Sequence, residues 1–184
     1  MKQAERRGRT RREIQEAFMA LVSERGFDRV TVKDICLRAD INRNTFYLHY
    51  TDKDTLASAI VDRLIATQAG GVIEEATHMS RSAPEKTEQI VKNVLSMLEE
   101  ERQFYQVFFT DEGLSRHLRP LRQLAYRMMV ASASAPISPV AVDFVIGGME
   151  GVLTSYLDGK IGTADEVAPK LARLLTSSFT ELAP

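Results

Sequence analysis

The stretch TVKDICLRADINRNTFYLHY, residues 31–50, decides the fold class of the chain. Thr31 stands three residues before Asp34, the spacing of a helix-capping pair, and Asn42 directly precedes a second short helix as its N-cap residue. This order gives a helix of about eight residues, a turn of about three, and a second helix that is polar at its start and apolar behind. The segment therefore predicts a helix-turn-helix.

The second helix of this motif begins with side chains suited to reading DNA. Its N-terminal turn enters the major groove in a helix-turn-helix protein, and here it carries Arg43, Asn44 and Thr45. Arginine pairs with guanine, asparagine pairs with adenine, and the threonine methyl group can touch that of thymine. Tyr47 and His49 can reach phosphate oxygens and hold the protein in register on the duplex. We therefore expect double-stranded DNA as a partner.

Helical periodicity dominates the rest of the chain as well. Apolar residues at intervals of three and four predict a helix over about residues 10–25, ended by Gly26. Asp52 is expected to cap a longer helix, which Gly70 and Gly71 either bend or end. No stretch shows the sustained alternation of a half-buried strand, so we predict an all-α chain of about nine helices.

Charge divides the chain into two parts. Residues 1–54 hold 12 Lys and Arg against 9 Asp and Glu, whereas residues 55–184 hold 12 against 16. The first twelve residues carry a net charge of +5, on an arm that either neutralises phosphates or is a solvated, frayed terminus. We expect a helix-turn-helix DNA-binding domain of three helices over 1–54 and a helical regulatory and dimerisation domain over 55–184.

Composition excludes several other classes of protein. The 184 residues include one Cys, so no internal disulfide can form, and the basic N-terminus lacks the apolar stretch of a signal peptide. No run approaches the roughly 18 to 20 consecutive apolar residues of a membrane-spanning helix. We expect a cytoplasmic protein without membrane association.

Residues capable of catalysis or metal binding do not form a recognisable site. The sequence holds no Gly-x-Ser-x-Gly elbow, no phosphate-binding glycine loop and no His/Glu metal pair. His78 and His117 have no Cys or carboxylate at ligand spacing and are expected to be solvated. Cys36 falls on the apolar face of its helix, as a buried hydrophobic residue would. We predict neither an enzyme nor a metal or cofactor site.

The residues around the motif resemble the DNA-binding domain of the tetracycline-repressor (TetR) family. The patterns T-V-x-D-I-x-x-x-A, N-R-x-T-F-Y-x-H-Y and D-K-x-x-L follow one another, and the resemblance covers roughly residues 8–60. It implies an all-α homodimeric transcription factor, usually a repressor, whose C-terminal helices bind a small molecule. Asp40 stands where most relatives have Gly, in a turn whose left-handed conformation Asp also tolerates.

This resemblance also implies roles for individual residues in the head. The family's base-reading positions fall on Arg43, Asn44 and Thr45. Its phosphate-contacting positions fall on Thr31, Tyr47, His49 and Lys53.

Aromatic and sulfur-containing side chains gather in the C-terminal part of the sequence. A small apolar or aromatic effector bound between helices would suit them, and the candidate residues are Phe104, Tyr105, Phe108, Met128, Phe144 and Tyr156. The same side chains are equally consistent with an ordinary hydrophobic core. Only the family resemblance favours a cavity, and it does so for the set as a whole.

The last helices are expected to pair two copies of the chain. Glycines in the segment GGMEG allow close helix approach, either at a subunit interface or within one chain. The candidates for a four-helix dimer contact are Val145, Gly148, Val152, Leu171, Leu174 and Leu175.

Two functions are compatible with these patterns. The main hypothesis is a homodimeric repressor that is released from a pseudo-palindromic operator when a small ligand binds. The alternative is a co-regulator whose C-terminal bundle binds a partner protein in place of a small ligand.

Overall fold

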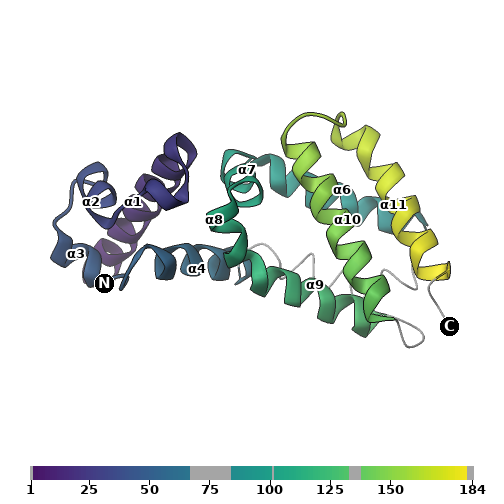
Figure 1. Ribbon diagram of the computed structural model, residues 1–184, viewed down its shortest axis with the longest axis horizontal. Helices are drawn as coiled ribbons and strands as arrows, with labels where there is room; N and C mark the ends of the chain where they lie inside the picture. Colours follow the sequence, from purple (N-terminus) through teal and green to yellow (C-terminus); the bar gives the residue numbers. More distant parts are fainter. Residues whose placement is uncertain (1, 67–83, 101, 133–137, 182–184) are drawn as a thin grey trace.

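The computed structural model describes residues 2–66, 84–100, 102–132 and 138–181, and every regular element in these ranges is helical (Figure 1). Besides the four-residue α8 (Glu112–Ser115) and the 3-10 turns η1 (Phe27–Arg29) and η4 (Arg116–Leu118), these residues form nine α-helices. Their bounds are α1 (Lys2–Arg25), α2 (Val32–Arg38), α3 (Arg43–Tyr47), α4 (Lys53–Leu64), α6 (Pro84–Glu100), α7 (Arg102–Thr110), α9 (Arg119–Ser132), α10 (Pro139–Leu157) and α11 (Ala164–Glu181). Over the described residues, the prediction of an all-α fold with about nine helices is confirmed.

The first helix, α1, runs from Lys2 to Arg25 without a break. The sequence predicted a start near residue 10, so the basic arm is in fact the first part of this helix. Gly26 ends α1 with a φ of 80°, a left-handed conformation that favours glycine. Phe27 is buried directly behind it.

The helix-turn-helix forms as the sequence predicts. Thr31 and Asp34 make a complete capping box at the start of α2. Asp40 is the turn residue, with a left-handed φ of 50°. Asn42 caps α3 by accepting a hydrogen bond from the backbone N–H of Thr45 at 2.7 Å. We call α1, η1, α2 and α3 the head, which occupies one end of the elongated molecule (Figure 1).

Helix α4 connects the head to the remaining helices, which we call the bundle (α6 to α11) (Figure 1). Asp52 caps α4 by accepting a hydrogen bond from the backbone N–H of Thr55 at 2.6 Å. The buried residues of α4, which are Leu56, Ala57, Ile60 and Val61, share the hydrophobic core of the head, and Leu114 of α8 joins the same core. The predicted boundary between residues 54 and 55 lies within this helix and stays a prediction. Gly70 and Gly71 lie outside the described residues.

The bundle surrounds a second hydrophobic core. Helix α11 lies along α6, and α10 packs against α7 and α9. Leu95, Tyr156 and Ala168 are among the residues buried between these helices. Pro120 is the second residue of α9, so it marks the start of that helix and not a kink within it.

Helix α10 is long and apolar enough, by length and composition alone, to cross a membrane. The mean hydropathy of α10 is 1.4. Glycines and polar residues interrupt the apolar runs of this helix, and for this reason the sequence did not suggest a membrane span. The helix also carries Asp143 and Glu150, whose charges are costly inside a bilayer. Only 28% of it is buried, so α10 exposes an apolar surface of the kind that contacts another molecule.

Candidate nucleic-acid interface and ligand cavity

Helix α3 presents a polar first turn to solvent. Arg43 and Asn44 are exposed, and the Asn42 cap holds the backbone of this turn behind them. Thr45 is partly buried and its hydroxyl donates to Asn42 Oδ1 at 3.0 Å, so its methyl group is the part left for a base contact. A fixed backbone that carries two exposed polar side chains is what direct base readout requires.

Phe46 anchors α3 and leaves its neighbours outside. The Phe46 side chain is fully buried, whereas Tyr47 is 52% exposed and Leu48 is 72% exposed. Positions 43, 44, 47 and 48 are separated by about one helical turn, so their side chains share one face. The sequence did not lead us to predict Leu48 as part of this face. The signal that could have done so is a large apolar residue at a position where the neighbouring residues of the face are polar.

The basic start of α1 lies beside this face. Burial, and then the charges of Arg11 and Arg7, lower the pKa of His49 below its ordinary value. The two arginines are therefore near enough to extend the positive surface next to α3. Of the two interpretations of the basic N-terminus, this position favours the phosphate-neutralising one.

Thr31 and Lys53 make contacts within the head. Thr31 Oγ1 donates to Asp34 Oδ2 at 2.5 Å, and the hydrogen bonds from Thr31 lower the pKa of the Asp34 carboxyl. Lys53 Nζ donates to the backbone oxygens of Phe27 at 2.8 Å and Asp28 at 3.3 Å, and it lies 4.3 Å from the centre of the Phe27 ring. Both residues stabilise the head, and their contacts with phosphates stay predictions.

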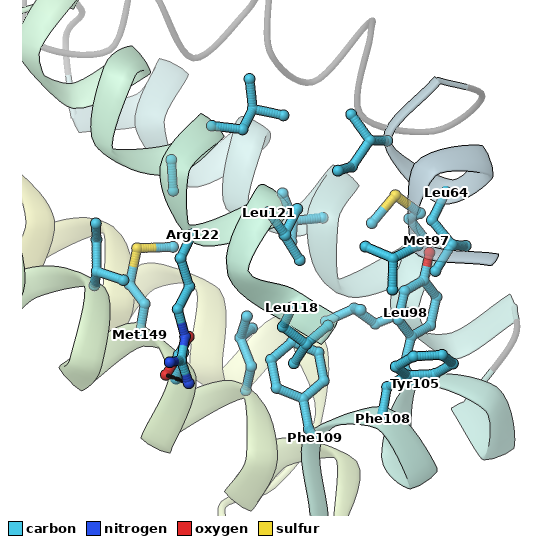
Figure 2. A pocket seen from close by; sticks show the side chains of 18 residues that line it. Leu64, Met97, Leu98, Tyr105, Phe108, Phe109, Leu118, Leu121, Arg122 and Met149 are labelled. Atoms are coloured by element: carbon cyan, nitrogen blue, oxygen red, sulfur yellow. Dashed lines mark hydrogen bonds and ion pairs between the residues drawn. The ribbon is translucent and has the colours of Figure 1, made fainter. Parts of the chain in front are cut away.

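An apolar cavity of about 220 Å³ lies between α4, α6, α7, α9 and α10 (Figure 2). Figure 2 shows Leu64 and Tyr105 toward one side of it and Arg122 and Met149 toward the other. Apart from Arg122 and Glu150, its lining residues carry no charge. Concave apolar sites with a few polar groups are the usual binding sites of small molecules.

The structure places the six predicted ligand residues in different environments. Tyr105 and Phe108 line the cavity. Phe144 does not, because it lies on the outer surface of α10 with 75% of its side chain exposed. Tyr156 is buried in the core of the bundle and is not part of the cavity wall. The side chains of Phe104 and Met128 lie outside the described part of the chain.

Tyr156 belongs instead to a group that stabilises the end of α10. The Arg102 guanidinium donates to the backbone oxygens of Tyr156 at 2.9 Å and Leu157 at 3.0 Å, and to Glu99 Oε1 at 2.9 Å. Burial and then the neighbouring Glu99 carboxylate raise the pKa of Tyr156 to about 12. The phenol therefore stays protonated near neutral pH, as a structural hydrogen-bonding group does.

The segment after α7 fastens the bundle to the head at Phe27. Asp111 Oδ2 accepts a hydrogen bond from the backbone N–H of Phe27 at 2.9 Å. Gly113 approaches so closely that a Cβ atom there would lie 2.9 Å from the Phe27 ring, which is nearer than real Cβ atoms come. A side chain at Gly113 would therefore separate the two parts.

His117 completes this contact and is not solvated, which corrects the expectation from the sequence. Only 9% of its side chain is exposed; Nδ1 lies 3.1 Å from Ser58 Oγ and Nε2 lies 3.3 Å from Asp54 Oδ1. His117 is buried because η4 packs against α4. The apolar periodicity of these two segments does not predict this contact. Burial lowers the pKa of His117 against the opposing effect of Asp54. We call the following set the junction: Phe27, Asp54, Asp111, Gly113 and His117.

The cavity and the junction share structural elements. Val61 and Leu64 line the cavity, and they belong to the same helix as Asp54. Leu118 also lines the cavity and directly follows His117 of the junction. Helix α4 therefore runs without a break from the cavity wall to the junction, next to the helix-turn-helix.

One face of α10 is apolar and exposed. Val140 is 78% exposed, Phe144 follows one turn later, and Gly148 and Gly151 continue the same stripe. A Cβ atom added at either glycine would meet open space, so no contact among the described residues requires glycine there.

The predicted dimer residues divide between this face and the core. Gly148 and Leu174 are exposed and Val152 is partly buried. Val145, Leu171 and Leu175 are buried in the core of the bundle itself. Periodicity located apolar faces correctly but did not show which of them the chain covers by itself.

Other candidate chemistry finds no support in the residues that the structure describes. Among them, no group of three or more His, Cys, Asp or Glu side chains is placed to hold a metal ion. Cys36 is buried, and burial raises the pKa of its thiol, which keeps it in the unreactive protonated form. His78 lies outside the described ranges.

Comparison with known proteins points to the same region of the chain. Residues 14–60 match the family model of bacterial regulatory proteins of the tetR family. The HTH-type transcriptional regulator YxbF of Bacillus subtilis (strain 168) is 24% identical over 131 residues, which make up 71% of this chain and 34% of YxbF. The regulator YvdT of the same organism is 35% identical over 52 residues, 28% of this chain and 27% of YvdT. The chain thus matches about a third or less of the length of these curated relatives.

The fold as a whole also has solved counterparts. A structure from Syntrophomonas wolfei, described as a TetR-family transcriptional regulator, superposes with a TM-score of 0.75 at 12% identity and covers 94% of this chain and 96% of that one. A capped helix-turn-helix with an exposed polar tip, carried on a helical bundle, defines a DNA-binding regulator. Residues 14–60 give the chain the DNA-binding domain of the tetR family, so the chain is a TetR-type DNA-binding regulator. Proteins of this family are regulators and not enzymes, which agrees with the prediction for this chain.

Proposed function

We propose that the protein is a homodimeric repressor that binds a pseudo-palindromic operator and leaves it when a small ligand enters the bundle. The observation that carries the proposal is the exposed face of α3, where Arg43, Asn44, Tyr47 and Leu48 stand over the buried Phe46. Such a face fits a major groove, with base contacts from the first turn and phosphate contacts beside it. A protein of this kind works in the cytoplasm, where the chromosomal DNA is.

A second copy of the chain would cover the exposed face of α10. Val140 and Phe144 are large apolar side chains, and the glycines that follow them would let two identical helices approach closely. Pairing α10 and α11 across a two-fold axis gives a four-helix contact. Two recognition helices are then available for half-sites about 34–36 Å apart, one turn of B-DNA. A symmetric dimer accounts for this exposed face better than an unrelated partner protein does, because the same surface of both copies forms the contact.

A ligand in the cavity would act on the head through α4. Leu64 of this helix lines the cavity, and Asp54 of the same helix lies in the junction. A shift of α4 would alter the separation of the two recognition helices and weaken operator binding. A coupling free energy of about 1–3 kcal/mol corresponds to a release of about 5- to 150-fold.

Substitution of the proposed contact residues tests the assignment of the head. After an operator has been selected from random DNA, fluorescence anisotropy would measure the binding of Arg43→Ala, Tyr47→Ala and the double variant. We expect Arg43→Ala to cost about 1–3 kcal/mol and to relax specificity, and Tyr47→Ala to weaken binding to all sequences alike. Arg119→Ala, which removes an exposed arginine of α9, is the matched control. Wild-type binding by the double variant would contradict the proposal.

A further inference from the structure

The wall of the apolar cavity contains one ion pair. Arg122 of α9 donates to Glu150 of α10 through two hydrogen bonds, from Nε to Oε1 and from Nη2 to Oε2, the second of them 2.9 Å long. Both residues line the cavity, whose other walls are apolar (Figure 2). The Arg122 side chain is 47% exposed and the Glu150 side chain 29% exposed, so the pair lies where the cavity meets solvent. Arg122 therefore places a solvent-accessible guanidinium at the edge of the apolar cavity.

A polar groove adjoins the cavity at Arg122. This groove has a volume of about 380 Å³, lies between α9 and α10, and is lined by Arg122, Gln123, Tyr126, Arg127, Asp143 and Ile146. Arg122 and Ile146 line both spaces, whereas Glu150 lines only the cavity. The groove contains two guanidinium groups and one carboxylate. Glu150 balances the charge of Arg122 from the adjoining wall, so what the groove offers beside the apolar space is a set of guanidinium hydrogen-bond donors.

We propose that the ligand of this site is an amphipathic anion, with an apolar tail in the cavity and a carboxylate on Arg122. This inference rests on the proposed function, because it names the class of effector for the same cavity. A guanidinium has five N–H donors, and the two hydrogen bonds to Glu150 leave three for a ligand. Its planar fork matches a carboxylate in a bidentate pair, which a neutral alcohol does not reproduce.

Ligand binding would also change the contact between α9 and α10. A ligand carboxylate bound to the remaining N–H groups would share the charge of the guanidinium with Glu150, so it would weaken the pair that joins the two helices. Helix α10 also carries Phe144 on the face proposed to form the dimer. The ligand therefore acts on a helix that connects the cavity with the second subunit, in addition to α4.

The full-length chain can be titrated by calorimetry with decanoate, decan-1-ol and decylamine, each below the concentration at which it self-associates. We expect decanoate to bind at least about tenfold more tightly than the other two. Arg122→Met keeps an unbranched side chain without the charge, and it should lower decanoate affinity about tenfold while decanol affinity stays within about twofold. Glu150→Gln removes the competing carboxylate and should raise decanoate affinity. Arg119→Met is the matched control and should change neither.

Two results would overturn the assignment of an anionic ligand. One is decanol or decylamine binding as tightly as decanoate. The other is unchanged decanoate affinity in Arg122→Met, checked for native folding by circular dichroism. Because Glu150→Gln predicts the opposite sign, the assignment remains testable if Arg122→Met fails to fold.

Binding of the neutral fluorescent probe N-phenyl-1-naphthylamine distinguishes failure of the anion assignment from failure of the proposed function. If the probe binds in the bundle and decanoate does not, the anion assignment is wrong and the ligand cavity stands. If neither binds, both are wrong. If decanoate binds as expected and operator affinity does not change, the anion assignment holds and the proposed release from DNA is wrong.

Discussion

The head and the bundle differ in how strongly their physical tasks restrict the amino-acid sequence. The head holds the five-residue helix α3 in one position, and side-chain caps do much of this. Thr31 and Asn42 each accept a hydrogen bond from a backbone N–H at the start of a helix of the head, and Asp52 does the same for the connecting helix α4. Few residue types can do so, which makes such positions recognisable in a sequence.

The bundle encloses an apolar cavity, and many combinations of apolar side chains can do that. Leu, Met, Phe, Val and Ile all occur in the wall of its cavity. Exchanges among such residues at constant volume usually cost little free energy. The family model accordingly matches residues 14–60 and not the bundle. The comparison teaches that a sequence identifies the part that must be specific and leaves open the part that need only be apolar.

Removing Phe27 should have the largest effect, because its side chain links the two regions. Its ring meets Phe18 edge-on at 6.0 Å between centroids, and it is the buried member of the junction. We expect Phe27→Ala to lower the free energy of unfolding by about 3–5 kcal/mol in urea titrations. Leu37→Ala, in an exposed position of α2, should change it by less than about 0.5 kcal/mol. Equal effects of the two substitutions would mean that head and bundle are not joined at Phe27.

A charge on the outer face of α10 should separate the subunits and leave each chain folded. Phe144 is exposed in the single chain, so Phe144→Glu should hardly alter its helical content. Loss of a buried aromatic contact in the proposed dimer should weaken association by about 2 kcal/mol or more. Sedimentation velocity would detect the monomer. A dimer that persists unchanged would show that α10 pairs with something else.

His117 and Phe144 show why the bundle was harder to predict than the head. The caps and the positive φ of Asp40 follow from local rules, and the structure has them as predicted. The burial of His117 depends on a contact with Ser58, which lies 59 residues away in the sequence. Phe144 follows the same periodicity as core residues although it faces outward. Periodicity identifies an apolar face, but it cannot tell which partner covers that face.

Loss of the α3 cap tests whether the position of α3 depends on the identity of the capping residue. Asn42 Oδ1 accepts hydrogen bonds from the backbone N–H and the hydroxyl of Thr45. Asn42→Ala should cost about 1 kcal/mol of stability, and Asn42→Ser should restore most of it. Thermal unfolding measures both variants. If Ala and Ser behaved alike, the cap would not be what positions α3.

The pH dependence of folding should show the smallest effect. Burial lowers the pKa values of His117 and His49 in the folded protein, so the unfolded chain takes up protons first as the pH falls. The free energy of unfolding therefore keeps its highest value above about pH 6.5, and it decreases as the pH falls below this value. His117→Asn should reduce the slope between pH 7 and 5 in urea titrations. An unchanged slope would mean that His117 is not desolvated at the junction.

Selection of bound DNA from a random pool by the full-length protein tests most directly whether α3 reads DNA as part of a dimer. The expected product is an inverted repeat whose half-site centres lie about one helical turn, 10 to 10.5 base pairs, apart, and the double variant Arg43→Ala/Tyr47→Ala should enrich no such sequence. Enrichment of a single unpaired site, or of the same repeat by the double variant, would contradict it.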